Sequence, residues 1–119
     1  MCYIYAVHEG LCSLRLTRRF RATPAEVWAA MTEPESLRRW LGDVELRVRG
    51  EEPGRLLELE WGAGGEEPSV VRIELSPSED GTVLVLDHSR LAEPIGMAAM
   101  RAWTEALTRL ESLLGEDGP

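Results

Sequence analysis

The sequence predicts an α+β domain in which a curved antiparallel sheet wraps around one long C-terminal helix. Three observations predict this architecture. Apolar and polar residues alternate in several segments between residues 13 and 89, as in strands with one buried face. Two helix-start signals, at Thr23 and Thr32, interrupt the strands near the beginning of the chain. After about residue 95 the apolar residues recur at intervals of three and four, which is typical of an amphipathic helix.

The first regular strand is expected at residues 13–22. Its apolar face would hold Leu14, Leu16, Phe20 and Ala22. Alternation places Arg18 on this apolar face as well. A cation there needs a carboxylate partner or an anionic ligand head group, and the sequence leaves both open. Residues 1–12, which precede this strand, are expected to form an N-terminal arm or an extra edge strand.

Two short helices are expected next, at residues 24–31 and 34–41. The first begins with a capping box, in which the side chains of Thr23 and Glu26 each accept a hydrogen bond from the other residue's backbone N–H. The same Thr-x-x-Glu spacing starts again at Thr32, so we expect a second capping box there. Neither helix is long enough to be stable alone, so both must pack on the rest of the domain.

Four further strands are expected before the long helix, separated by turns and by a glycine-rich loop. They cover residues 44–49, 55–61, 69–76 and 82–89. In the last of them, alternation turns Thr82, Leu84, Leu86 and His88 inward.

The long helix is expected from about residue 95 to residue 114. Its apolar stripe would hold Met100, Trp103, Leu107, Leu110 and Leu114. We therefore place one domain at residues 13–115, followed by a frayed tail at residues 116–119.

Composition excludes several classes of function. The net charge of −8 disfavours unspecific binding to nucleic acid or to an anionic membrane. Cys2 and Cys12 fit no zinc or redox spacing, so neither a metal site nor a cofactor is expected. The first residues do not form a signal-peptide pattern, and no apolar run reaches the length of a membrane span. We expect a cytoplasmic protein with free thiols.

Motifs along most of the chain, from about residue 14 to residue 114, carry a family resemblance. They are Arg18, Phe20-x-Ala22, Pro24, Glu26-Val27-Trp28, Thr32, Pro34-Glu35-x-Leu37 and Trp40, then Leu59-x-Trp61, Gly81-Thr82-x-Leu84-x-Leu86-x-His88-Ser89 and Trp103-x-x-x-Leu107-x-x-Leu110. This pattern resembles the SRPBCC superfamily of START-like, helix-grip domains. The branch it resembles is that of the bacterial relatives of the heat-shock-protein-90 ATPase activator C-terminal domain. The resemblance implies the helix-grip fold.

The chain departs from the family pattern in one stretch. Only 21 positions separate Trp40 from Trp61, and the glycine-rich stretch often found there is missing. We therefore expect a sheet shortened by about two strands, with a smaller cavity between the sheet and the long helix.

The candidate site lies between the sheet and the long helix. Trp40, Trp61 and Trp103 should converge there, either as pocket lining or as core filler. His88 is a candidate polar anchor, or a histidine satisfied by its neighbours. Met97 and Met100, at the open end of the long helix, could adapt to varied apolar ligands or fill gaps in the core. Arg18 completes the ligand-binding candidates.

These residues favour non-catalytic binding of a small apolar or amphipathic molecule. One alternative, implied by the resemblance, is a protein-interaction or chaperone-activator module with a filled core. Another is a cyclase- or hydrolase-like enzyme, although the sequence offers no catalytic residues in a recognisable arrangement. An unknown apolar ligand, a second copy of the chain and a protein partner all remain open as binding partners.

Overall fold

A computed structural model describes residues 2–8, 11–42, 46–61 and 69–116. In this part of the chain six strands form one antiparallel sheet, in the order β1-β2-β6-β5-β4-β3. The strands are β1 (Cys2–His8), β2 (Leu11–Phe20), β3 (Leu46–Glu52), β4 (Leu56–Trp61), β5 (Ser69–Ser78) and β6 (Gly81–Ala92). The helices are α1 (Pro24–Thr32), α2 (Pro34–Trp40) and α3 (Glu93–Glu116). The expected glycine-rich loop, the first residues of the strand expected at 44–49 and the end of the expected tail lie outside the described residues.

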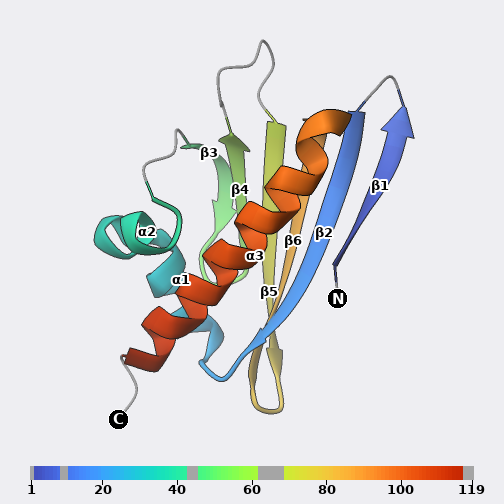
Figure 1. The fold of residues 1–119 in the computed structure, drawn as a ribbon. Coiled ribbons are helices and arrows are strands. Elements are labelled where there is room, and N and C mark those ends of the chain that lie inside the picture. Colours follow the sequence, from blue (N-terminus) through green and yellow to red (C-terminus); the bar gives the residue numbers. More distant parts are fainter. Residues whose placement is uncertain (1, 9–10, 43–45, 62–68, 117–119) are drawn as a thin grey trace.

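The three helices cover one face of the sheet (Figure 1). The long helix α3 crosses this face and packs against β2 and β6, while α1 and α2 pack against α3. The sheet and helices enclose a single apolar core, to which all three helices contribute buried side chains. The predicted α+β helix-grip architecture is therefore confirmed.

The inner and outer faces of the sheet follow the predicted alternation. On β6, Thr82, Leu84, Leu86 and His88 are all buried, and Val83 and Val85 between them are only partly buried. The N-terminal segment forms the edge strand β1, which pairs with β2. None of the helices in the described residues is long and apolar enough to cross a membrane.

The two short helices begin in different ways. Thr23 makes the predicted capping box, since its side chain accepts from the Glu26 N–H and the Glu26 carboxylate accepts from the Thr23 N–H. The second predicted capping box is wrong. Helix α1 continues through Thr32, whose hydroxyl donates to the Trp28 carbonyl oxygen, and Glu33 becomes the N-cap of α2 without a side-chain cap. A threonine in the last turn binds back within its own helix and cannot cap the next one.

The end of β6 contains an irregularity that the sequence did not predict. Between the pairs Cys12–Leu91 and Leu14–His88, β6 has one residue more than β2. Arg90 lies in this bulge with a left-handed φ of 63°. Bulges bend a strand and re-aim its side chains, and this one immediately follows His88.

Candidate functional site

A buried hydrogen-bonded triad joins the sheet to α3. His88 on β6 pairs across the sheet with Val71 on β5, so both side chains point into the core. The indole Nε1–H of Trp103 donates to His88 Nδ1 over 2.9 Å. The other ring nitrogen, Nε2, lies 2.7 Å from the Ser69 hydroxyl oxygen. The rings of His88 and Trp103 meet edge to face with their centroids 6.0 Å apart.

The indole partner determines the protonation state of His88. An indole N–H can only donate, so Nδ1 must carry a lone pair. The proton of the neutral ring is therefore on Nε2, which donates to Ser69. Burial lowers the pKa of His88 from 6.5 to about 4. At neutral pH this histidine is uncharged. Its Nδ1 links the sheet to α3 through Trp103, and its Nε2 links β6 to β5 through Ser69.

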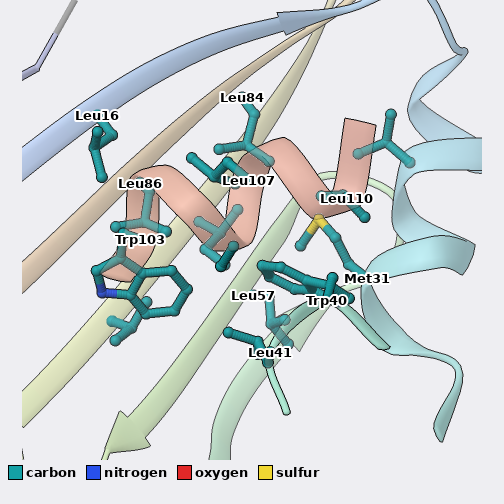
Figure 2. Close-up of a cluster of buried hydrophobic side chains, with 14 of the residues drawn as sticks. Leu16, Met31, Trp40, Leu41, Leu57, Leu84, Leu86, Trp103, Leu107 and Leu110 are labelled. Atoms are coloured by element: carbon teal, nitrogen blue, oxygen red, sulfur yellow. The ribbon is translucent and has the colours of Figure 1, made fainter. Parts of the chain in front are cut away.

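Trp40, at the end of α2, packs against the same tryptophan. The ring centroids of Trp40 and Trp103 lie 6.3 Å apart with a tilt of 45°. Figure 2 shows both rings within the cluster that also contains Met31 and Leu57. The Arg109 Nε–H of α3 donates to the Trp40 carbonyl oxygen over 3.0 Å, which ties the end of α2 to α3.

The indole N–H of Trp40 differs from that of Trp103. Only 1% of Trp40 is exposed, and its Nε1 is the one buried side-chain N or O atom without a hydrogen-bond partner among the described residues. Sequence reasoning placed Trp40 in the interior, but the pattern of residue types cannot reveal which of several buried indoles lacks an acceptor.

Arg18 lies on the inner face of β2, as alternation predicted, and pairs across the sheet with Leu84. Its guanidinium donates to the Thr108 hydroxyl over 3.1 Å and forms an ion pair with Glu111 at 3.6 Å. Both partners belong to α3. The structure therefore gives Arg18 a carboxylate partner within the chain, one of the two expected alternatives.

The remaining candidates lie in other surroundings. Met97 is 74% exposed near the beginning of α3, and Met100 is partly buried against the core. Trp61 ends β4, opposite Leu46 and Ser69, but its side chain is outside the described part of the structure. The structure thus joins Trp40, His88 and Trp103 in one cluster and adds Ser69, which sequence analysis did not select. The cross-strand register was the missing signal, because it depends on loop lengths that alternation does not reveal.

The described residues contain no group of three or more His, Cys, Asp or Glu side chains that could hold a metal ion. A cavity of about 420 Å³ lies at the end of β2 and the turn between β5 and β6, where Arg19, Arg21, Glu79 and Asp80 line it. None of the candidate residues lines this cavity.

Comparison with known proteins agrees with this architecture of a sheet gripping a long helix. The profile of the family described as "Activator of Hsp90 ATPase homolog 1-like protein" matches residues 51–115. The chain therefore belongs to this family, within the helix-grip superfamily that its motifs resemble. No curated protein matches the chain.

Solved structures show the same fold. The Mesorhizobium loti protein MLL2253 is similar with a TM-score of 0.83 and 21% identity, over 90% of this chain and 99% of that one. CalU16 from Micromonospora echinospora is similar with a TM-score of 0.78 and 28% identity, over 87% of this chain and 76% of that one. The Chromobacterium violaceum protein CV1439 has a TM-score of 0.77 at 18% identity, over 86% and 96% of the two chains.

Proposed function

We propose that this domain binds a small apolar or amphipathic molecule between the sheet and α3, beside Trp40 and Trp103, and performs no chemistry on it. One observation carries the proposal. The apolar inner face of the sheet continues from the core to solvent at β3. Val48 pairs across the sheet with Leu59, so both side chains share the inner face. Leu59 is 4% exposed, whereas Val48 is 57% exposed.

Such a surface suits a ligand of moderate size. Small-molecule sites are mostly apolar and contain only a few polar groups that orient the ligand. Trp40 and Trp103 are 1% and 2% exposed, so a ligand would contact their rings only where it displaces the side chains that cover them. An apolar molecule that covered Val48 would remove the exposed apolar area of this side chain from water, which favours binding at roughly 25 cal/mol per Å².

A direct test uses 2-ethylnaphthalene as the probe, with binding measured by equilibrium dialysis. We expect saturable binding to the wild-type chain. Val48→Glu should weaken it about tenfold, because a carboxylate at the apolar entrance resists desolvation. Arg47→Glu is the matched control. It adds a carboxylate at the neighbouring exposed position of β3, whose side chain alternates to the other face.

The proposal predicts that the Arg47→Glu variant binds 2-ethylnaphthalene as tightly as the wild type. Absence of saturable binding to the wild type would reject the proposal. Equal weakening by both substitutions would show that the probe is not held at the inner face.

A second candidate, an interaction with a protein partner, is favoured by the family match. The family description names activation of an Hsp90 ATPase. The packed contact between Trp40 and Trp103 also suits a domain with a filled core. ATP hydrolysis by a bacterial Hsp90, measured with increasing amounts of the chain, tests this candidate. A saturable rise in rate would support it, and an unchanged rate would reject it.

A further inference from the structure

We infer that the molecule held beside Trp40 carries an uncharged hydrogen-bond acceptor, such as a ketone or ester carbonyl, to which the Trp40 indole N–H donates. This inference rests on the proposed ligand-binding function and specifies its chemistry. Its basis is the Trp40 Nε1 atom, which is buried and has no partner in the described part of the protein.

A buried donor without an acceptor is rare in folded proteins, and it destabilises them. A phenylalanine at this position would avoid the cost, because its smaller ring is apolar and carries no polar atom. Trp103 shows the usual solution, since its own N–H donates to His88 at 2.9 Å. Trp40 packs against that satisfied indole, but no group in the described part of the chain accepts from its own N–H. The free donor therefore points to an acceptor supplied by a bound molecule.

The donor defines the class of ligand group. An indole N–H has no acceptor capacity, so an alcohol or amide would bind through its oxygen and not through its hydrogen. A carboxylate could also accept, but moving it from water into this apolar cluster costs far more than one hydrogen bond returns.

The basic side chains that could bind an anionic ligand already have partners within the chain. His88 is neutral and lies between Trp103 and Ser69, and Arg18 binds Thr108 and Glu111. Arg109 is an exposed residue whose Nε–H donates to the Trp40 carbonyl oxygen. These contacts favour a neutral acceptor over an anion.

Three naphthalenes of similar shape provide the test. 2-Acetylnaphthalene has a neutral acceptor, 2-ethylnaphthalene has none, and 2-naphthoate has a charged one. We expect the wild type to prefer the ketone over the ethyl compound in equilibrium dialysis. Trp40→Phe should reduce this preference by at least about threefold, which corresponds to a typical neutral hydrogen bond. Because the smaller ring weakens all three ligands through lost contact area, the preference is the quantity compared.

Trp28→Phe is the matched control. Trp28 lies on α1, is partly buried against the core and does not belong to the candidate site. This variant should keep the preference for the ketone. A second measurement does not depend on the folding of either variant. In the wild type, the Trp40 indole proton, assigned by NMR through its own backbone, should move downfield with the ketone and not with the ethyl compound.

The outcomes separate the two proposals. If the naphthalenes bind and the preference survives Trp40→Phe, or the indole proton does not respond to the ketone, the inference is wrong and the proposed function stands. If naphthoate binds as tightly as the ketone, the requirement for an uncharged group is wrong. If none of the three compounds binds, both the inference and the proposed function fail.

Discussion

Acidification should destabilise the domain through His88. The folded protein holds this imidazole neutral, with a pKa lowered from 6.5 to about 4 by burial. A histidine in the unfolded chain titrates near 6.5. The unfolded state therefore binds more protons than the folded state between these two values, and the free energy of unfolding must fall as the pH falls through this interval. Above pH 6.5 the contribution is complete.

The size of the effect follows from the same interval. One pKa unit corresponds to 1.36 kcal/mol, so the interval from 6.5 down to about 4 corresponds to a loss of about 3 kcal/mol. The hydrogen bond from Trp103 also lowers the stability of the charged form, because a proton on His88 Nδ1 would face the N–H of Trp103.

Urea unfolding at several pH values between 7 and 4 measures this loss. The carboxylates of the chain also titrate at acid pH, so the wild type must be compared with a variant that lacks only the imidazole. His88→Gln is suitable because an amide can accept from Trp103 and donate to Ser69 without titrating. We expect the stability of the wild type relative to this variant to decrease by about 3 kcal/mol between pH 7 and pH 4. A constant difference, or an NMR pKa near 6.5 for His88, would refute the reasoning.

Three further predictions concern stability in urea at neutral pH. Thr23→Ala should cost about 1 kcal/mol, because it removes a capping acceptor, whereas Thr32→Ala should cost less than about 0.5 kcal/mol; equal losses would contradict the assigned caps. Gly81→Ala should cost about 3 kcal/mol, since its Cβ would lie 2.1 Å from the Phe20 carbonyl oxygen. Gly54→Ala is the control, because this glycine has a φ of +81° but its added Cβ would meet open space; it should cost only about 1 kcal/mol. If both glycine substitutions cost the same, the steric argument for Gly81 is wrong. Arg18→Met should cost less than about 1 kcal/mol because the ion pair with Glu111 is partly exposed, and a larger loss would show a stronger pair.

Much of the fold could be predicted because its strands and helices show regular periods. Alternation alone placed His88 on the inner face of β6, and helical spacing alone placed Trp103 on the buried side of α3. A short sequence motif gave a wrong prediction where the same residues fit both a helix start and the last turn of the preceding helix. The Thr-x-x-Glu spacing at Thr32 looked like a cap, but α1 continues through this residue and its hydroxyl binds Trp28.

The site was harder to predict than the fold because its contacts depend on the register between distant segments. Ser69 reaches His88 only because β5 and β6 pair with Val71 opposite His88. The bulge at Arg90 depends on the positions of single atoms, and so does the Trp40 indole, which finds no acceptor among the described residues. The partial exposure of the inner face at Val48 depends on which strands α3 covers. No periodicity of residue types encodes these features.

The central claim is that a molecule binds between the sheet and α3 beside the two buried tryptophans. NMR chemical-shift mapping of the ¹⁵N-labelled chain with 2-acetylnaphthalene tests it most directly. We predict that the indole signals of Trp40 and Trp103 and the backbone amide of Val48 shift together and saturate at the same ligand concentration. Shifts confined to outer-face residues such as Val83, or no shifts up to the solubility limit of the ketone, would contradict the claim.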